Sequence, residues 1–315
     1  MNLNNINRVK DTIAYKQDNI FIVCASFEER TKAIVEKLTT EIKLDAAFIF
    51  KFNEKNLTNL REKNFIRQKE ILAKHAKYVC PILCDHHNPT DGIKNFRKIL
   101  ADLKIGLNNK KVILDISTFT KQYLFLILKF LDSFKLSQLR IFYTEPFKYA
   151  IKDQPLSFGY IDTVSVPSFG GHIDILKPNL LIVFLGYEGE RALALWERFA
   201  PHKTIVLIGR PKSEKKWDGR VEKFNKKLIN KISSKEKRYI SSDNPFKIKQ
   251  TINKLINRNS SKFNISISVL GPKPQAVGCF LAVKNNPNVQ LLYSIPKYHN
   301  EIYFSESIST IWEYY

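Results

Sequence analysis

The chain has few of the features that mark secreted, membrane-spanning or disulfide-linked proteins. Its 315 residues include only four cysteines, at positions 24, 80, 84 and 279. No apolar run reaches the roughly 18 residues that a transmembrane helix needs. The opening stretch, MNLNNINRVKDTIAYKQDN, is polar and lacks the apolar core of a signal peptide. We therefore expect a cytoplasmic protein without a membrane partner.

The cysteines also do not favour a metal site. The segment CPILCDHH (80–87) brings two cysteines and two histidines together in sequence. On a strand, Cys80 and Cys84 would share a face about 13 Å apart. Zinc–sulfur bonds of about 2.3 Å cannot span that distance. We predict core thiols in a reducing compartment, and no bound metal or cofactor.

Motifs of well-known enzyme classes are missing as well. The sequence contains no Walker A loop, no G-x-S-x-G elbow, no H-E-x-x-H helix and no complete dinucleotide fingerprint. Glu28, Glu188, Asp115 and His86 are candidate acid–base groups, but none has a partner at a diagnostic spacing. The sequence therefore assigns no catalytic residue. A binding role is favoured over catalysis, and cleavage of a nucleotide stays open as the alternative.

Acidic residues are scarce relative to basic ones. The chain carries 51 lysines and arginines against 30 aspartates and glutamates, a formal net charge of +21. Such an excess favours an anionic partner, such as nucleic acid, nucleotide phosphates or an acidic protein, although a solvated lysine-rich surface has the same composition. The most basic segment, 210–238, is predicted to be a basic helix with flanking loops. It is either a solvated surface or a nucleic-acid contact.

What the sequence does contain is an internal repeat. NIFIVCASFEERTKAIVEKL (19–38) and NLLIVFLGYEGERALALWERF (179–199) share one design: an apolar strand, a small residue, an aromatic, a glutamate, an arginine and an amphipathic helix. Ser26, Phe27 and Glu28 match Gly186, Tyr187 and Glu188 at an offset of 160, and Arg30 matches Arg191 after a one-residue insertion. Repeats of this kind determine the fold assignment.

The correspondence continues in the same order along both halves. Segments 46–52, 78–89, 112–123, 139–146 and 157–166 match 203–211, 237–245, 265–276, 289–296 and 305–314, which aligns Lys121 with Lys273. Short apolar strands alternating with helices predict parallel sheets covered on both faces. We therefore expect an α/β protein of two tandem Rossmann-like three-layer domains with parallel sheets, arising by duplication. The expected domains are 1–170 and 171–315, divided near Gly170-Gly171 and Pro178.

The polar residues shared by the halves lie just after strands, where open parallel sheets bind ligands and helix N-termini accept anions. Simple helix capping by Ser117 or Thr118 is the alternative explanation. Lys121 and Lys273 favour a bound anion, because a lysine in a helix's first turn opposes the helix dipole. The candidate ligand-binding residues are Ser26, Phe27, Glu28, Arg30, Asp115, Ser117, Thr118, Thr120, Lys121, Gly186, Tyr187, Glu188, Arg191, Gly271, Lys273 and Gln275.

These motifs resemble those of a known family. DISTFTK (115–121) resembles the strand-four signature of CARF domains, the CRISPR-associated Rossmann folds, and LGPKPQAVG (270–278) resembles the Gly-Thr-Lys-Pro form of that turn. Two such units in one chain are similar to the SAVED sensors. The sequence departs from the pattern at Phe119, which replaces a glycine, and at Pro272, which lacks the hydroxyl and the N–H donor.

The resemblance implies a sensor of a cyclic oligonucleotide in prokaryotic antiviral defence, with the ligand held between the strand-four turns of the two halves. It assigns phosphate contacts to the two lysines, hydrogen bonds to the hydroxyls of Ser117, Thr118 and Thr120, and base stacking to Phe27 and Tyr187. The Glu28/Arg30 and Glu188/Arg191 pairs would read base edges or hold the turn. An effector protein or a second copy of the chain would be the partner. The alternatives are a ring-nuclease-like phosphodiesterase and a basic nucleic-acid-binding scaffold.

Overall fold

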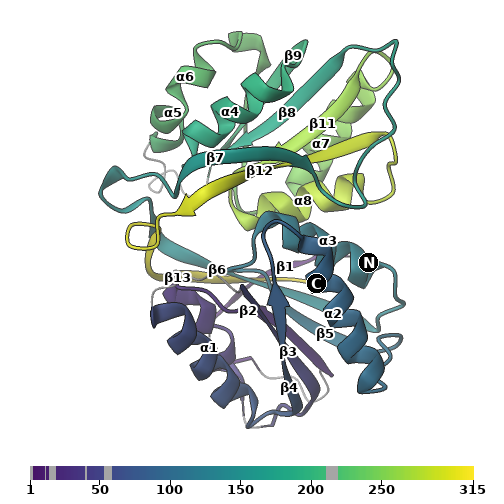
Figure 1. Ribbon diagram of the computed structural model, residues 1–315, viewed down its shortest axis with the longest axis vertical. Helices are drawn as coiled ribbons and strands as arrows, with labels where there is room; N and C mark the ends of the chain where they lie inside the picture. The colour runs from purple at the N-terminus through teal and green to yellow at the C-terminus, as the bar shows by residue number, and fades with distance from the viewer. Residues whose placement is uncertain (1–2, 11, 14–18, 40, 53–58, 211–218) are drawn as a thin grey trace. The chain divides into compact units, whose positions relative to one another are not determined.

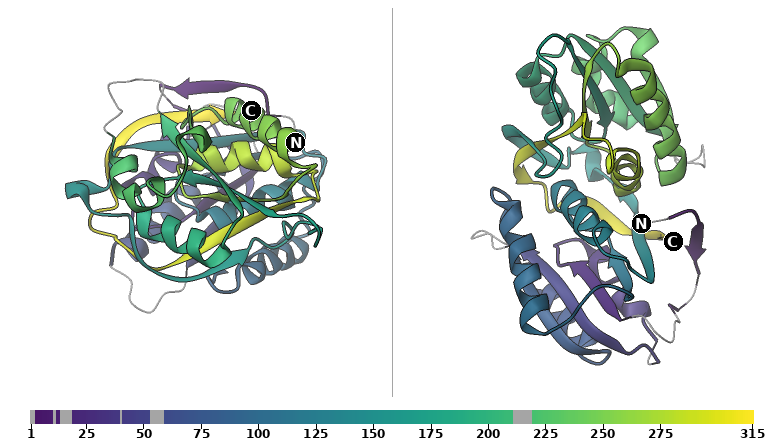
Figure 2. Two further views of the ribbon diagram at one scale, coloured as in Figure 1. Left: turned by 90° about the horizontal axis from the view of Figure 1, so that it is seen from above. Right: turned by 90° about the vertical axis from the view of Figure 1, so that its right-hand side faces the viewer.

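The computed structural model (Figures 1 and 2) describes residues 3–10, 12–13, 19–39, 41–52, 59–210 and 219–315. The chain divides into two compact units. Unit 1 consists of Met1–Lys148 together with Ser305–Tyr315, and unit 2 is Tyr149–Phe304. Within the described residues, none of the helices has the length and apolar character that crossing a membrane requires.

Unit 1 contains a sheet of seven strands in the order β1-β13-β6-β5-β2-β3-β4. Strands β2 to β6 are parallel neighbours within this order, and β13 pairs antiparallel with β1. The interior strand β2 is buried along its whole length, as its apolar sequence IFIVC predicts. The strands are β1 (Ile6–Val9), β2 (Ile20–Cys24), β3 (Leu44–Phe52), β4 (Ala76–Cys84), β5 (Lys111–Asp115), β6 (Gln138–Tyr149) and β13 (Ser305–Tyr314).

Unit 2 contains a sheet of six strands in the order β10-β9-β8-β11-β12-β7. All neighbours are parallel except β12 and β7, which pair antiparallel. The strands are β7 (Ser157–Ser165), β8 (Asn179–Leu185), β9 (Lys203–Arg210), β10 (Lys237–Ser241), β11 (Asn264–Val269) and β12 (Val289–His299).

The two sheets share one strand order. Numbered from the first strand of each repeat, both read 3-2-1-4-5, so the order reverses between strands one and four. The expected α/β class is therefore confirmed, as two units whose sheets are mixed and largely parallel. The strand order reverses between β2 and β5 in unit 1, and between β8 and β11 in unit 2. Ligands of open α/β sheets bind outside the carboxyl ends of the strands at such points.

Helices cover the sheets of both units (Figure 2). Unit 1 has α1 (Asn59–Leu72), α2 (Pro89–Asp102) and α3 (Lys121–Asp132), with short 3₁₀ turns η1 (Glu29–Lys32) and η2 (Val35–Lys37). Unit 2 has α4 (Gly189–Phe199), α5 (Arg220–Phe224), α6 (Lys226–Ile229), α7 (Pro245–Asn259) and α8 (Lys273–Val283), with 3₁₀ turns η3 (Ile151–Asp153) and η5 (Ser234–Glu236).

The first helix of each repeat differs from the expected pattern in unit 1. The sequence predicted an amphipathic helix after both first strands, but after β2 the chain forms only η1 and η2, whereas α4 follows β8. The β-branched residues Thr31, Ile34 and Val35 disfavour a helix in the first copy. The corresponding stretch RALALWERF is rich in alanine and leucine, which favour one.

The terminal strands are exchanged between the repeats. Strand β7 follows β6 in sequence but pairs with β12, and β13 follows β12 but lies between β6 and β1 (Figure 1). The observed units therefore differ from the expected ranges 1–170 and 171–315. The difference arises because sequence matching places each tail, 157–166 or 305–314, with its own repeat, whereas strand pairing places it with the other.

Candidate functional site

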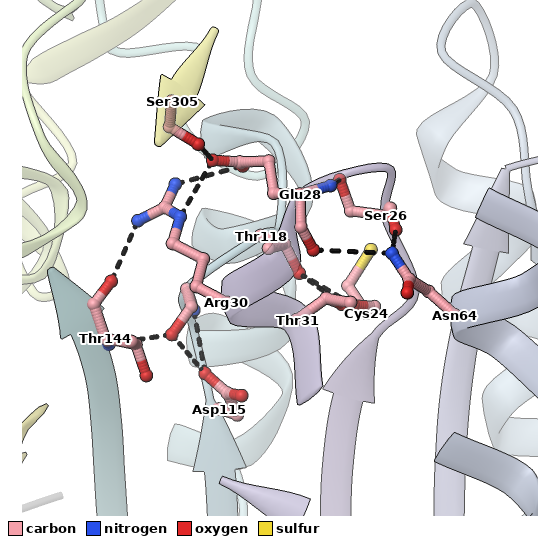
Figure 3. A network of polar contacts seen from close by, with 11 residues as sticks. Cys24, Ser26, Glu28, Arg30, Thr31, Asn64, Asp115, Thr118, Thr144 and Ser305 are labelled. Atoms are coloured by element: carbon pink, nitrogen blue, oxygen red, sulfur yellow. Dashed lines mark hydrogen bonds and ion pairs between the residues drawn. The ribbon is translucent and has the colours of Figure 1, made fainter. Parts of the chain in front are cut away.

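The first polar cluster of unit 1 lies where β2 ends. Glu28 and Arg30 are buried there as an ion pair, with Arg30 Nε 2.8 Å from Glu28 Oε2 and Arg30 Nη2 3.0 Å from Glu28 Oε1. Arg30 Nη1 donates to the carbonyl of Thr144 on β6 at 2.9 Å. The Ser305 hydroxyl, at the start of β13, donates to Glu28 Oε2 at 2.7 Å (Figure 3). The buried Glu28–Arg30 pair thus joins the turn, β6 and the exchanged strand.

Unit 2 repeats this cluster with its own residues. Arg191 Nη1 lies 2.7 Å from Glu188 Oε1, and both side chains are buried. Arg191 also donates to the carbonyl of Ser294 on β12. The Ser157 hydroxyl, the first residue of the exchanged strand β7, donates to Glu188 Oε1 at 3.0 Å. The same serine–glutamate–arginine arrangement therefore links the exchanged strand of each unit to its strand-one turn, the turn after β2 or β8.

These contacts assign a role to the Glu28/Arg30 and Glu188/Arg191 pairs. A buried charge is tolerated only when it is paired and hydrogen-bonded. In each pair the arginine bonds to the glutamate and to a backbone carbonyl of the fifth strand of its repeat. The glutamate also accepts from the first serine of the exchanged strand. Of the two roles that the sequence left open, reading base edges or holding the turn, the contacts support holding the turn.

The aromatic residue of each strand-one turn is covered by an arginine. The Arg61 guanidinium carbon lies 5.0 Å from the centre of the Phe27 ring, and that of Arg220 lies 5.2 Å from the centre of the Tyr187 ring. Cation–π attraction favours both contacts. Phe27 and Tyr187 therefore already stack against protein groups, so base stacking by these rings is not supported by their surroundings.

Sequence reasoning missed the asparagines that support these turns from the following helices. Asn64 donates to the carbonyl of Ser26 at 2.8 Å, and Asn225 donates to the carbonyl of Gly186 at 2.7 Å. Asn64 and Arg61 recur as Asn225 and Arg220 at spacings close to the offset of 160 between the repeats. Extending the repeat alignment into the second helical segment would have found both pairs.

Ser26 and Gly186 are matched in position but differ in packing. A Cβ atom on Gly186 would lie 2.2 Å from the carbonyl oxygen of Leu270, so only glycine fits against that strand-four turn. Ser26 is buried, and its hydroxyl accepts a long hydrogen bond of 3.5 Å from the Glu28 amide. Gly186 therefore permits the strand-one and strand-four turns of unit 2 to approach closely. Ser26 instead stabilises the strand-one turn of unit 1 through its hydrogen bond.

The strand-four turn of unit 1 is centred on a buried carboxyl group. Asp115 ends β5 and is 1% exposed. Its Oδ1 accepts from the Ser117 amide at 2.9 Å and from the Ser117 hydroxyl at 2.5 Å, and Ser117 Oγ accepts from the Thr144 amide at 2.8 Å. Burial raises the pKa of Asp115 to about 6, although the Ser117 hydrogen bonds and the Arg30 charge oppose the shift.

The remaining hydroxyls of this turn bond to backbone. Thr118 donates to the carbonyl of Cys24 at 2.6 Å, and Thr120 is the N-cap of α3, accepting from the Tyr123 amide at 3.4 Å. Phe119 is buried, with its ring centre 5.3 Å from that of Phe50. Lys121 is half-buried at the first position of α3. The turn is therefore rigid, and it places Lys121 at a helix N-terminus.

The strand-four turn of unit 2 is one residue shorter and chemically different. The strand register places Ser268 where unit 1 has Asp115. Pro272 is the N-cap of α8, and the half-buried Lys273 is its first residue. Gln275 is fully buried, its amide donating to the carbonyl of Ser241 at 3.3 Å, and a Cβ on Gly271 would collide with its oxygen. Gln275 therefore connects α8 to the end of β10.

The helix N-termini at these turns are electropositive. Neither α3 nor α8 has an acidic residue in its first turn, and each begins with a lysine. The free N–H groups of a helix's first turn already carry partial positive charge. A lysine added there suits an anion such as phosphate. A lysine at the first position of a helix is the feature that both turns share.

The described residues offer little for metal chemistry. Within them, no group of three or more histidine, cysteine, aspartate or glutamate residues could hold a metal ion. None of the four cysteines, all within the described part of the chain, forms a disulfide; Cys24, Cys84 and Cys279 are buried, as predicted, and Cys80 is half-buried. Burial raises the pKa of Cys84 to about 12, so this thiol is an unreactive core residue.

The basic segment 210–238 differs from the single helix that was expected. It forms two short helices, α5 and α6, and the 3₁₀ turn η5, while residues 211–218, with Lys212, Lys215 and Lys216, lie outside the described residues. Two of its basic side chains have partners within the protein, because Arg220 donates to the carbonyl of Tyr149 and Lys223 pairs with Asp153 at 3.1 Å.

Comparisons with known proteins give no functional assignment. No family model matches the chain, and no curated protein matches it. A solved structure of the cytoplasmic domain of a prokaryotic cation chloride cotransporter matches over 91% of this chain and 99% of that chain, at 10% identity and a TM-score of 0.29. A similarity at this level carries no argument about function.

Proposed function

We propose that this protein is a sensor or regulatory protein that binds an anionic nucleotide at the strand-four turn of unit 1. The resemblance of DISTFTK (115–121) to CARF domains narrows the proposed ligand to a cyclic oligonucleotide and the setting to prokaryotic antiviral defence. The further expectation, that one ligand is held between the turns of both halves, stays a prediction.

One observation carries the proposal. In both units, a helix that begins with a lysine starts at the point where the strand order reverses. This is the position at which open α/β sheets bind phosphate-bearing ligands. The dipole of α3 would favour an acid rather than Lys121 in its first turn, so the charge is better explained by an anion than by helix stability.

The same geometry favours binding over cleavage. The hydroxyls of Ser117 and Thr118 make short hydrogen bonds within the protein, and Asp115 is buried beneath them. A general acid or base must reach the proton that it transfers. A rigid turn whose hydroxyls already have partners is suited to holding a phosphate through backbone amides and Lys121.

The test is native mass spectrometry of the full-length chain with cyclic di-, tri- and tetranucleotides, and with linear mononucleotides for comparison. We expect one or more cyclic ligands to be retained by the parent chain and lost in Lys121→Ala. The matched control is Lys129→Ala, which removes a lysine from the last turn of the same helix. Chromatography of the incubated ligand then separates binding from hydrolysis.

Two results would contradict the proposal. Retention of none of the nucleotides by the parent chain would remove the sensor role. Equal retention by the parent chain and Lys121→Ala would move the site away from the N-terminus of α3.

A further inference from the structure

The loop between β7 and β8 exposes three large aliphatic side chains within four residues. Ile173, Ile175 and Leu176 are 61%, 94% and 88% exposed. We call these three residues the apolar tip. Single exposed aliphatic residues are common on soluble proteins, but a contiguous group marks an interaction site. The apolar tip belongs to unit 2, whereas the nucleotide is assigned to a turn of unit 1.

The apolar tip is held in place by hydrogen bonds at its base. Asn264, at the start of β11, accepts from the Asp174 amide at 2.9 Å and donates to the carbonyls of Asp174 and Lys177 at 2.8 and 2.9 Å. The His172 amide donates to the carbonyl of Pro287 at 2.8 Å. A loop fixed at both ends presents its aliphatic side chains without the entropy cost of ordering them on contact.

Part of the backbone of this loop is hydrogen-bonded internally. The Leu176 amide donates to Asp174 Oδ1 at 3.0 Å, and the Lys177 amide donates to the Asp174 carbonyl at 3.0 Å. The Asp174 carboxylate also lies 3.8 Å from Lys177 Nζ. The amides of Asp174, Leu176 and Lys177 therefore cost less free energy to bring to an apolar interface than unbonded amides would.

The surroundings of the apolar tip are basic. Lys177 Nζ donates to the carbonyl of Ser260, just after α7, and Arg258 and Lys262 are exposed on either side of that serine. Helix α7 contains two further lysines in its first five residues, one in its third turn, and no acidic residue. Over 168–178 and 258–264 the one acid is Asp174. Exposed aliphatic side chains in a mainly basic segment favour an anionic apolar surface.

We infer that the apolar tip inserts into an anionic lipid surface, with Lys177, Arg258 and Lys262 contacting the headgroups. The contact is peripheral and reversible, because one short loop enters the interface. It departs from the sequence-based expectation of no membrane partner, which considered only spanning segments and signal peptides. It is independent of the proposed nucleotide site and concerns where the protein acts.

The test is flotation of the full-length protein with vesicles of phosphatidylcholine alone and of phosphatidylcholine with phosphatidylglycerol. We expect retention on the anionic vesicles only. The double variant Ile175→Ser/Leu176→Ser should lower the partition coefficient by about tenfold or more, because two aliphatic side chains no longer enter the hydrocarbon. The control is Ile302→Ser, which changes another aliphatic side chain of unit 2 that is 78% exposed.

A second variant reports on insertion itself. Ile175→Trp places an indole at the most exposed position of the apolar tip. Its fluorescence should shift to shorter wavelength with anionic vesicles and should be quenched by brominated lipid. Absence of wild-type flotation, equal flotation of the double variant, or an unshifted indole spectrum would each overturn the inference. If another surface held the protein on the vesicles, the double variant would float as well as the parent chain. If the apolar tip bound a protein instead of lipid, the parent chain would not float.

Discussion

Asp115 has a different chemical counterpart in the second repeat. It is fully buried with one oxygen bonded to Ser117, and Oδ2 has no hydrogen-bond partner among the described residues. The corresponding position of unit 2 holds Ser268, which is also buried. Both repeats therefore have a lysine at the helix N-terminus, but they differ at the strand-end position before it. At that position only unit 1 has a group that binds a proton near neutral pH.

The raised pKa of Asp115 predicts a pH-dependent stability. Between 3.8, the ordinary pKa of an aspartate, and the folded value of about 6, the native state keeps a proton that the unfolded chain releases. Stability therefore falls as the pH rises through this window, by up to about 3 kcal/mol. Asp115→Asn should remove that fall while keeping the hydrogen bond from Ser117. Urea unfolding of both proteins at about pH 4 and about pH 7 measures the difference.

The control for this measurement is Asp102→Asn, at an exposed position at the end of α2. It should leave the pH profile unchanged. If Asp115→Asn and the parent chain lost stability in parallel between the two pH values, the carboxyl group would have a normal pKa.

At the scale of elements, the exchanged strands β7 and β13 determine how each sheet is completed. Each begins with a serine that donates to the buried glutamate of the other repeat, Ser157 to Glu188 and Ser305 to Glu28. These strands form antiparallel pairs, β7 with β12 and β13 with β1. The buried ion pairs therefore connect strand exchange to the strand-one turns.

We predict that removing either serine hydroxyl destabilises the unit that it closes. Ser305→Ala and Ser157→Ala should each lower the free energy of unfolding by about 1–2 kcal/mol, because a hydrogen bond to a buried charged group is lost. Urea denaturation with circular dichroism measures the effect. Ser261→Ala, at an exposed loop position, should change little. Serine variants as stable as the parent chain would show that the strand pairing alone holds the exchanged strands.

At the scale of the whole molecule, the exchange makes the units discontinuous in sequence. Unit 1 needs residues 305–315 from the C-terminal end, whereas unit 2 is the continuous stretch Tyr149–Phe304. Each unit has its own core of buried apolar side chains, centred on β2 and β3 in one and on β8 and β9 in the other. A unit that contains all its strands should fold by itself, and one that lacks an edge strand should not.

This division predicts which fragments fold. The fragment 149–304 should unfold cooperatively in urea, because it contains every strand of its sheet. The fragment 171–315, the domain expected from sequence matching, lacks β7 and carries an unpaired β13, so it should be less stable or aggregate. Circular dichroism and size-exclusion chromatography compare the two. Equal cooperativity of both fragments would show that the exchanged strand is dispensable.

The sequence by itself determined the α/β class and the alternation of strands and helices in each repeat, apart from the helix expected after β2, where the chain forms η1 and η2. Apolar runs such as IFIVC and LLIVFL read directly as buried parallel strands, because burial on both faces removes polar residues. It also placed Lys121 and Lys273 at helix N-termini, since the repeat aligned them after equivalent strands.

Only the tertiary structure decided which sheet each tail joins and what the shared glutamates and arginines do. An edge strand pairs through its backbone, so its sequence does not specify its neighbour. Glu28 and Arg30 are two residues apart and polar, a pattern that fits a ligand site as well as a buried pair. Their role became visible once Thr144 and Ser305, distant in sequence, were found to complete their hydrogen bonds.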